Sequence, residues 1–240
     1  MQFKKEEAMS IELRSKPKIA PKSKPKAKLK AKPKRVTRRR KFAFQFDTNV
    51  LIVHFGPLKE KITDDEFFEF CVSNPYLRIE MSKDGEIMIM MPTGSEGGNR
   101  SFNLSGEFRI WVKQDGSGVG FDSSTGFTLP NGAKRSPDLS WIRRDRWDAI
   151  PRRQRKKFAP ICPDFVVELR SDSDQIEPLK TKMEEYIENG AQLGWLIDPL
   201  KKKVYIYRPN AEVEILDKPK TLSGEPVLKG LKLDLAGIID

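Results

Sequence analysis

Hydrophobic residues show no regular spacing before residue 42, and periodic patterns begin there. Phenylalanine occupies every second position over residues 42–46, and residues 51–55 form a short apolar run, so the composition becomes that of a globular domain. Thr63 and Glu66 then have the spacing of a capping box, just before a group of apolar residues. This spacing predicts a helix that begins at Thr63.

A β-hairpin is predicted next, because residues 77–80 and 86–91 flank the strong turn dipeptide Asp84-Gly85. The following segment predicts a helix over about 98–113, since four of its apolar residues lie on one helical face. These four residues are Leu104, Phe108, Trp111 and Val112.

The centre of the domain is predicted at residues 163–198, which have the pattern of strand, helix and strand. Residues 165–170 and 193–197 are two nearly continuous apolar strands, and Pro178 suits the first turn of the helix between them. Two such strands joined through a helix predict a right-handed parallel crossover. Residues 204–207 predict an antiparallel partner strand. We therefore expect an α/β fold of the mixed α+β kind.

Shorter elements are expected on both sides of this centre. Residues 118–142 indicate two or three short strands, and residues 143–158 indicate a short helix and a loop. Leucines alternate over residues 231–235 and predict one last short element.

One carboxylate, Glu168, stands in the middle of the apolar strand at residues 165–170. A buried charge costs roughly several kcal/mol unless it is paired or bound to a metal ion. Strand alternation places Val166, Glu168 and Arg170 on the same face of the sheet. Glu168 is therefore the first candidate for a functional residue.

A second carboxylate, Asp138, starts a predicted strand, so it can sit on the strand adjacent to Glu168. Two converging carboxylates make an oxygen site that suits Mg²⁺ or Mn²⁺. Such a site usually needs a cation beside it to orient the attacking water and to neutralise a phosphate. We assign this role to Lys182, because lysine can transfer a proton, and an electrostatic or structural role to Arg170. The alternative is a structural ion pair of Glu168 with either cation, which is the commoner arrangement in proteins.

The net charge of +11 is concentrated at the start of the chain. Residues 1–41 hold 17 Lys and Arg against 3 Glu, a net +14, whereas residues 42–240 hold 28 basic and 31 acidic residues, a net −3. Lys-Pro and Lys-Ala steps with little apolar surface predict a disordered basic arm at residues 1–41. Its composition suits salt-dependent contacts with phosphates, and it suits a solubilising or targeting extension without a specific partner equally well.

Several classes of protein are disfavoured by composition. Cys71 and Cys162 are too few and too scattered for a disulfide scaffold or a zinc knuckle, which fits a reducing, cytoplasmic location. No stretch approaches 18 uninterrupted apolar residues, so no membrane span is expected. His54 is the only histidine, which disfavours histidine-based catalysis and a histidine metal cluster.

Three segments together resemble the Uma-type restriction endonuclease family, a bacterial family within the PD-(D/E)XK nuclease superfamily. They are SPDLSWI at 136–142, CPDFVVELRSDSD at 162–174 and KTKMEEYIENGAQLGWLIDPLKKKVYIYRP at 180–209. The likeness extends from about Thr63 to the C-terminus and leaves out the basic arm. In combination these motifs are fairly specific for the family.

The resemblance implies a restriction-endonuclease-like domain over residues 42–240, with a mixed central β-sheet flanked by helices. It implies that Asp138 is a metal-ligating aspartate and that Glu168 is the second acidic ligand. The superfamily's lysine is expected two residues after that acid, where this chain has Arg170. The resemblance therefore suggests that the lysine has moved to the following helix, at Lys182.

The superfamily also uses a glutamate on an early helix. Glu96, at the start of the helix predicted over 98–113, is the candidate for this glutamate, and Glu80 is the rival.

The resemblance thus implies a Mg²⁺- or Mn²⁺-dependent endonuclease that hydrolyses DNA phosphodiester bonds. Many members of the superfamily are dimers, so a homodimer is left open, although no dimer face can be recognised in the sequence. Arg170 at the usual lysine position supports a second hypothesis, a catalytically inactive nucleic-acid-binding module of the same fold. A third hypothesis is a structural or partner-binding domain in which Glu168, Arg170 and Lys182 only form an ion-pair cluster.

Overall fold

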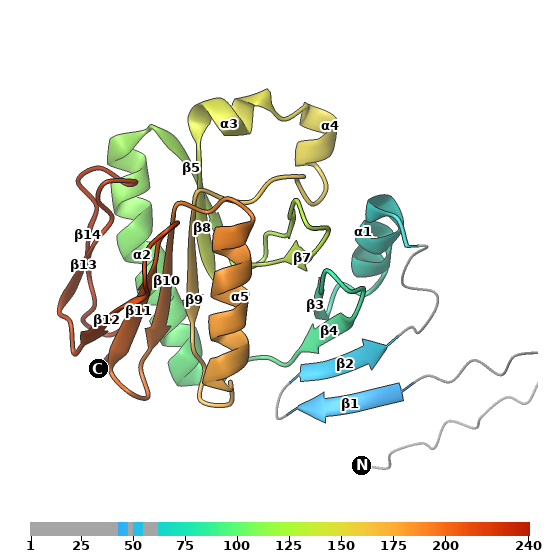
Figure 1. Ribbon diagram of the computed structural model, residues 1–240, viewed down its shortest axis with the longest axis horizontal. Helices are drawn as coiled ribbons and strands as arrows, with labels where there is room; N and C mark the ends of the chain where they lie inside the picture. The colour runs from blue at the N-terminus through green and yellow to red at the C-terminus, as the bar shows by residue number, and fades with distance from the viewer. Residues whose placement is uncertain (1–42, 48–49, 55–61) are drawn as a thin grey trace, which may run out of the picture. The chain divides into compact units, whose positions relative to one another are not determined.

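A six-stranded mixed sheet forms the centre of the described chain, with the strand order β12-β11-β10-β9-β8-β5 (Figure 1). The computed structural model describes residues 43–47, 50–54 and 62–240, without the side chains of 43–50, 53 and 54. Within this sheet β9 and β10 run parallel, and the other neighbouring strands are antiparallel. The strands are β5 (Gly118–Asp122), β8 (Leu139–Arg143), β9 (Phe165–Leu169), β10 (Leu193–Asp198), β11 (Lys203–Tyr207) and β12 (Glu214–Asp217).

A second sheet has six strands in the order β1-β2-β4-β3-β7-β6, and all its pairs are antiparallel. These strands are β1 (Ala43–Asp47), β2 (Val50–His54), β3 (Arg78–Met81), β4 (Ile87–Met90), β6 (Phe127–Thr128) and β7 (Lys134–Arg135). The predicted hairpin is confirmed, because β3 and β4 pair around Gly85, whose φ of 80° is freely available to glycine. The predicted arm at residues 1–41 and the side chain of His54 lie outside the described residues.

Helices cover both faces of the central sheet (Figure 1). On one face lies α2 (Ser95–Asp115), together with the hairpin of β13 (Thr221–Ser223) and β14 (Lys232–Asp234). The four residues predicted on one face of this helix are all buried there, which confirms the periodicity: Leu104, Phe108, Trp111 and Val112. On the other face lies α5 (Ile176–Glu188), which buries Met183 and Tyr186 against the sheet. The expected mixed sheet flanked by helices is thus confirmed.

The predicted parallel crossover is formed by β9, α5 and β10. Leu193 pairs with Phe165, and Ile197 pairs with Leu169, so two fully buried strands lie side by side between the helices. The Met183 Cε atom lies over Gly194, at the place where a Cβ atom would stand, so the end of this side chain fills the space that the glycine leaves on β10. The crossover therefore holds α5 at a fixed position above the middle of the sheet.

The predicted capping box is also present at the start of α1 (Asp64–Ser73). The Glu66 N–H donates to the Thr63 hydroxyl at 3.2 Å, and the Thr63 N–H donates to the Glu66 carboxylate at 2.8 Å. These two bonds satisfy backbone donors that a helix leaves free at its first turn.

Other segments differ from the prediction. Helix α2 begins at Ser95 rather than near residue 98, because a Gly-rich start carries no apolar pattern. Residues 143–158 contain two short helices, α3 (Arg144–Ala149) and α4 (Arg152–Arg155), where one was predicted. The sequence did not indicate β12 and β13, since most of their side chains are exposed and show no apolar alternation.

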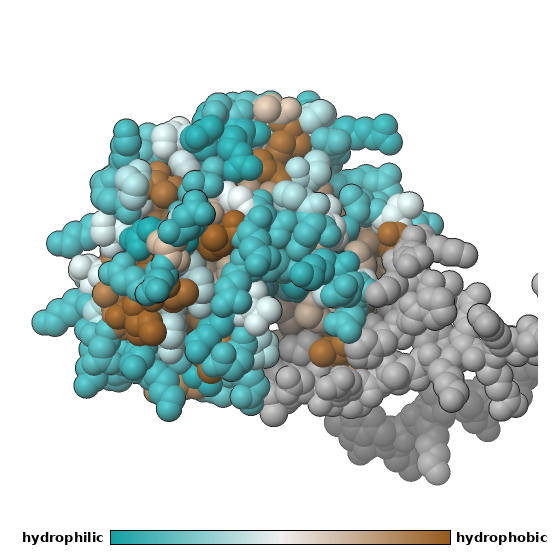
Figure 2. Space-filling model, viewed as in Figure 1, coloured by the Kyte–Doolittle hydropathy of each residue, from teal (hydrophilic) through white to brown (hydrophobic). Residues whose placement is uncertain are grey.

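The surface seen in Figure 2 is mostly hydrophilic, with hydrophobic residues in small separate groups. Among the described residues, no helix is long and apolar enough to cross a membrane. The two cysteines, Cys71 and Cys162, are both free thiols.

Candidate active site

Strands β8 and β9 bring Asp138 and Glu168 together. Leu139 pairs with Val167, so continuing this antiparallel register by one residue sets Asp138 directly opposite Glu168. The Leu169 N–H donates to Asp138 Oδ2 at 2.8 Å, which fixes the aspartate at the end of the strand pair. Residues opposite one another on neighbouring strands point to the same face of a sheet. The two carboxylates therefore share one face, as the sequence predicted.

Lys182 reaches this face from the middle of α5. Its Nζ atom lies 2.8 Å from Glu168 Oε1 and 2.9 Å from Glu80 Oε1. The lysine side chain is 12% exposed, and both glutamates are almost fully buried. The Met183 and Tyr186 side chains of the same helix are buried in the core. Their packing prevents the helix from rotating about its axis and so fixes the position of Lys182.

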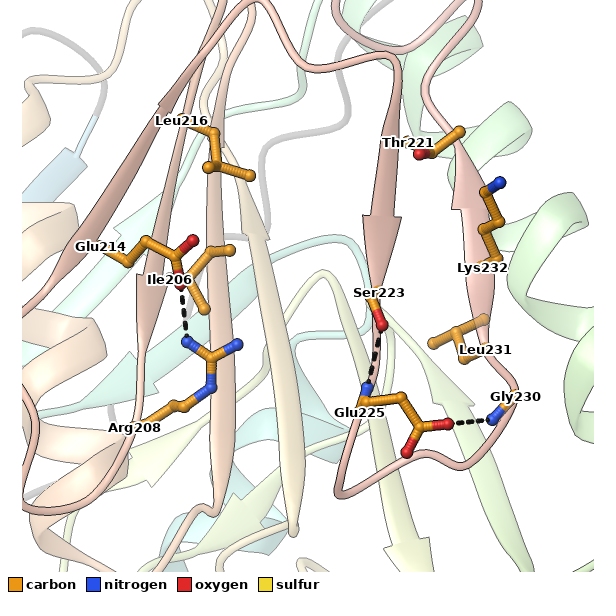
Figure 3. Close-up of a pocket in the computed structure, with 10 residues that line it drawn as sticks. All are labelled: Ile206, Arg208, Glu214, Leu216, Thr221, Ser223, Glu225, Gly230, Leu231 and Lys232. Atoms are coloured by element: carbon orange, nitrogen blue, oxygen red, sulfur yellow. Dashed lines mark hydrogen bonds and ion pairs between the residues drawn. The ribbon is translucent and has the colours of Figure 1, made fainter.

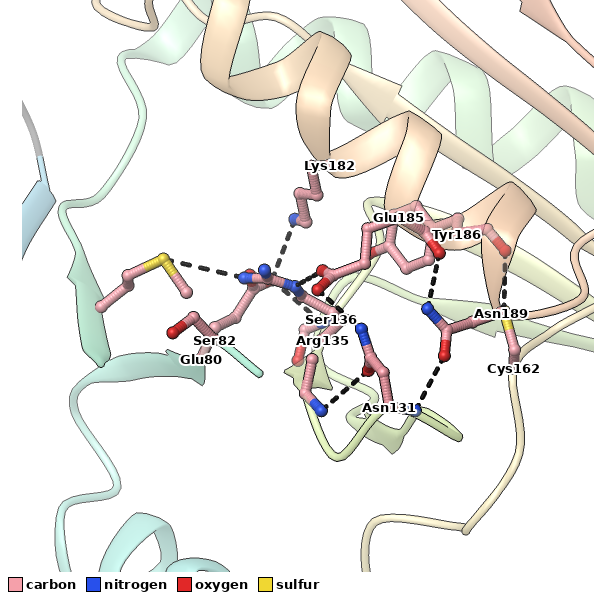
Figure 4. Close-up of polar contacts among 12 residues, drawn as sticks. Glu80, Ser82, Asn131, Arg135, Ser136, Cys162, Lys182, Glu185, Tyr186 and Asn189 are labelled. Atoms are coloured by element: carbon pink, nitrogen blue, oxygen red, sulfur yellow. Dashed lines mark hydrogen bonds and ion pairs between the residues drawn. The ribbon is translucent and has the colours of Figure 1, made fainter. Parts of the chain in front are cut away.

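Glu80, in the middle of β3, is held by donors on two sides (Figure 4). Its Oε1 atom also accepts a hydrogen bond from the Ser136 N–H at 2.9 Å, and its Oε2 atom forms an ion pair with Arg135 Nη1 at 3.2 Å. Arg135 Nε in turn lies 2.6 Å from Glu185 Oε2 on α5. This chain of charges links the second sheet to the helix that carries Lys182.

Tyr186 orients Glu168 from the buried side. The phenol O–H donates to Glu168 Oε1 at 3.0 Å, and burial raises the pKa of Tyr186 well above its ordinary value, so the phenol stays a neutral donor. Among the described residues, the one hydrogen bond and the one ion pair of the Glu168 side chain both involve Oε1. The second carboxylate oxygen is therefore available for another ligand.

The charges of this site shift the titration of its own groups. Burial raises the pKa of Glu168 to about 7, and the neighbouring Asp138 and Glu80 carboxylates add to this rise although Lys182 opposes it. Burial alone would lower the pKa of Lys182, but the attraction of Glu168 and Glu80 outweighs burial and leaves it above its ordinary value. Lys182 is therefore an ammonium ion at neutral pH.

Glu80 behaves in the opposite way to Glu168. Burial disfavours its ionisation, yet the charges of Lys182 and Arg135 together hold the pKa of Glu80 below its ordinary value. Glu80 is therefore a permanent anion that anchors the lysine, whereas Glu168 is the carboxylate whose charge is easily changed.

Arg78, the first residue of β3, is a further cation at the site. Its Nη2 atom lies 3.1 Å from Asp138 Oδ1 and donates to the Ser136 carbonyl oxygen at 2.8 Å. Neither Arg78 nor Arg135 was a candidate from the sequence, because β3 and β7 bring them to the site from distant or irregular segments. The available signal was local: Arg78 is two residues before Glu80 on the same strand face, and Arg135 stands just before the Ser136-Pro137 segment.

Two other predicted residues have structural partners. Arg170 forms an ion pair with Asp198 at 2.9 Å and donates to the Asp174 carbonyl oxygen, which matches the structural role considered for it. Glu96 lies in the first turn of α2 with its side chain 79% exposed, and its ion pair at 3.8 Å is with Arg100. The structure thus joins Glu80, and not Glu96, to Lys182.

The residues present fit a divalent ion of the magnesium type. Asp138 and Glu168 supply carboxylate oxygens from neighbouring strands, and their mutual repulsion contributes to the raised pKa of Glu168. Within the described ranges, no three Asp, Glu, His or Cys side chains are grouped so that they alone could hold a metal ion. A two-carboxylate set suits Mg²⁺, which keeps several waters and takes further ligands from phosphates.

Two hollows lie elsewhere on the described surface. One, of about 320 Å³, is formed by the start of α2 and by residues 171–173, and Glu96 is among its lining residues. The other, of about 400 Å³, lies between β11–β12 and the β13–β14 hairpin, where Arg208 pairs with Glu214 (Figure 3). Neither is lined by Asp138, Glu168 or Lys182.

The comparison with protein families identifies the chain. The model of the Uma2 family, described as "Putative restriction endonuclease", matches residues 64–236. The chain belongs to the Uma2 family. The resemblance predicted from the three motif segments is thereby confirmed, and a nuclease family implies a nucleic acid as the substrate.

A solved structure supports the Uma2 assignment. The protein of that crystal structure, from Anabaena variabilis, is described as "a putative nuclease belonging to DUF820". It is 26% identical in sequence, has a TM-score of 0.60, and the match covers 74% of this chain and 97% of that chain. The comparison with curated proteins gives no match.

Proposed function

We propose that this Uma2 chain is a Mg²⁺- or Mn²⁺-dependent endonuclease that hydrolyses phosphodiester bonds in DNA. The observation that carries the proposal is the convergence of three groups from three elements. Asp138, immediately before β8, lies opposite Glu168 of β9 when the strand register is continued by one residue, and the Lys182 ammonium lies 2.8 Å from Glu168 Oε1. Two carboxylates that can hold a divalent ion, with a cation beside them, suit metal-assisted hydrolysis of a phosphate, because both the ion and the cation stabilise the charge that develops on it.

In this proposal Asp138 and Glu168 hold the divalent ion. When bound, the ion stabilises negative charge on the phosphate and lowers the pKa of a water ligand. Glu168 would have to be ionised to serve as a ligand, so the protonated fraction of Glu168 would have to lose its proton first.

Lys182 supplies a hydrogen-bond donor and a positive charge next to these ligands. Its raised pKa favours the orientation of a water molecule over the removal of a proton from it. Glu80 keeps the ammonium in place through the contact of 2.9 Å, and Arg135 and the Ser136 N–H fix Glu80 in turn. Glu80 is thus the glutamate that we assign to the site, and Glu96 has no step in this mechanism.

Titration calorimetry of the DNA-free protein with Mg²⁺ tests the site without any need for the right substrate. The wild type should bind the ion, and Glu168→Gln should weaken binding at least tenfold because an amide oxygen replaces a carboxylate. Glu214→Gln is the matched control, since it is the same chemical change on β12, where Glu214 pairs with Arg208 at 3.0 Å. Equal Mg²⁺ affinity in all three proteins would refute the assignment of Glu168.

Cleavage of supercoiled plasmid with Mg²⁺ and with EDTA then separates the proposed function from its main rival. Nicking or linearisation that EDTA abolishes supports the endonuclease. Mg²⁺ binding together with salt-sensitive DNA binding, but without turnover on double or single strands, would instead establish the inactive nucleic-acid-binding module.

A further inference from the structure

The Arg78 side chain uses one nitrogen for both of the hydrogen bonds that it makes with described residues. Its Nη2 atom serves both the Ser136 carbonyl oxygen and Asp138 Oδ1. Its Nε atom is buried and has no hydrogen-bond partner among those residues. A buried donor without an acceptor costs roughly 1–3 kcal/mol, so an unused guanidinium edge requires an explanation.

The other end of the same strand pair shows what a purely structural arginine does. There Arg146 Nη1 lies 2.7 Å from Asp164 Oδ1, and Arg146 Nη2 donates to the Cys162 carbonyl oxygen at 3.3 Å. Each arginine therefore joins an aspartate to the carbonyl group two residues before it. Arg146 divides the two acceptors between two nitrogens, whereas Arg78 places both on one nitrogen.

The Arg78 side chain is partly open to solvent, from which an anion could reach the guanidinium. The Arg78 side chain is 38% exposed, and the Asp138 side chain, which its Nη2 atom contacts, is 17% exposed. Glu80 and Glu168 also lie within electrostatic reach of the guanidinium, so an anion is repelled here until a divalent ion offsets part of their charge. The planar edge formed by Nε and an Nη atom of arginine matches two oxygens of a phosphate, which a lysine ammonium cannot match in the same way.

We infer that Arg78 is the phosphate-binding residue of the site and that it competes with the divalent ion for Asp138. In the metal-free protein it neutralises Asp138. When a divalent ion takes over Asp138, the guanidinium turns its free edge toward a backbone phosphate of the DNA. This inference rests on the proposed function, because it assigns the substrate contact of the same site.

The test uses the full chain and the variant Arg78→Gln, with Arg146→Gln as the matched control. Binding of a DNA duplex is measured by fluorescence anisotropy at several salt concentrations, with Ca²⁺ in place of Mg²⁺ and with cleavage checked on gels. Losing one phosphate contact should reduce the slope of log affinity against log salt by about 0.9. All three proteins carry the same basic residues 1–41, so the contribution of that segment cancels in the comparison.

The second readout is Mg²⁺ affinity without DNA. Arg78→Gln should bind Mg²⁺ about threefold or more tightly, because the cation that competes for Asp138 is gone. A merely structural arginine would give the reverse result, since a misplaced Asp138 would weaken Mg²⁺ binding. Arg146→Gln should change neither the salt slope nor the Mg²⁺ affinity.

An unchanged salt slope, or weaker Mg²⁺ binding, in folded Arg78→Gln would overturn the inference. If that variant does not fold, Arg78→Lys decides, because it keeps the charge and loses only the planar edge. It should lower DNA affinity about tenfold, and unchanged affinity would overturn the inference. If the wild type does not bind Mg²⁺ and does not cleave DNA, the proposed function is refuted. The slopes of log affinity against log salt would still decide whether Arg78 contacts a phosphate.

Discussion

The two ends of the β8–β9 strand pair are built alike and differ in what surrounds them. A Pro-Asp dipeptide precedes each strand, and each aspartate accepts a backbone N–H from the far end of the partner strand. The Leu169 N–H donates to Asp138 at 2.8 Å, and the Arg143 N–H donates to Asp164 at 2.9 Å. An arginine pairs with each aspartate.

What distinguishes the two ends is the second carboxylate and the amine. Glu168 and Lys182 lie beside Asp138, with Glu80 behind them. The Pro-Asp dipeptide alone is therefore a way to close a strand pair, and it becomes a candidate active site only where another acid and a buried lysine join it. The pair of ends offers an internal control for every test of the site.

The largest expected effect is on cleavage by Asp138→Asn compared with Asp164→Asn. Loss of a metal-ligating carboxylate should reduce cleavage roughly 1,000-fold, since a metal ion contributes several kcal/mol to the transition state. Asp164→Asn should stay within about threefold of the wild type below its unfolding temperature. Initial rates on plasmid DNA measure both, and similar losses in the two variants would show that the two ends do not differ in function.

A large effect on stability is expected from Lys182→Met. This change leaves Glu168 and Glu80 buried without their shared cation, which should cost roughly 3–5 kcal/mol in the free energy of unfolding. The double variant Lys182→Met/Glu168→Gln should recover part of that loss, because it removes the carboxylate that loses its ion-pair partner, whereas Glu80 keeps Arg135. Urea denaturation with EDTA present measures the three proteins, and a Lys182→Met variant as stable as the wild type would contradict the ion-pair account.

A smaller effect on stability is expected from Asp164→Asn at the end without the second acid. The change weakens the ion pair with Arg146 at 2.7 Å and the acceptor of the Arg143 N–H. Hydrogen bonds to a charged group contribute roughly 1.5–3 kcal/mol, so the free energy of unfolding should fall by about that amount. The same denaturation experiment reports it, and a change below about 0.5 kcal/mol would mean that this end contributes little.

The smallest expected effect is a pH dependence of the free energy of unfolding that arises only at the end that carries Glu168. Its pKa is raised from an ordinary 4.5 to about 7, so between these values the folded protein binds more protons than the unfolded chain. Stability should therefore fall as pH rises through this window, and Glu168→Gln should lack that component. The stability of Glu168→Gln relative to the metal-free wild type should increase by roughly 1–2 kcal/mol from pH 5 to pH 7. A constant difference across the window would show that Glu168 ionises normally.

The fold could be predicted wherever apolar residues repeat with a clear period or a turn or helix cap has a recognisable local sequence. The apolar face of α2, the turn at Gly85, the capping box at Thr63 and the crossover of β9, α5 and β10 all follow from local sequence. The strands β12 and β13 could not be predicted, because edge strands with exposed side chains are held by backbone pairing that leaves little pattern in the sequence.

The candidate site was predictable in part for the same reason. Glu168 could be recognised as a charge within an apolar strand. The position of Asp138 opposite Glu168 could be predicted because it follows directly once β8 and β9 are neighbours. The contacts of Arg78 with Asp138 and of Lys182 with Glu80 join residues 60 and 102 positions apart. Contacts between such distant segments depend on how the second sheet meets the first, which no local pattern encodes.

The path of the chain between β8 and β9 has a consequence for how this protein can tolerate change. Residues 144–164 leave the strand pair after Arg143 and return before Phe165, at the end remote from Asp138 and Glu168. Extra length added at the exposed α4 would therefore not alter the spacing of the two acids, whereas a single residue inserted within β8 would turn Asp138 to the opposite face. A fused module could therefore be inserted at α4 while leaving the geometry of the candidate site intact, although buried residues of this segment such as Ile150, Ala159 and Ile161 would have to be kept.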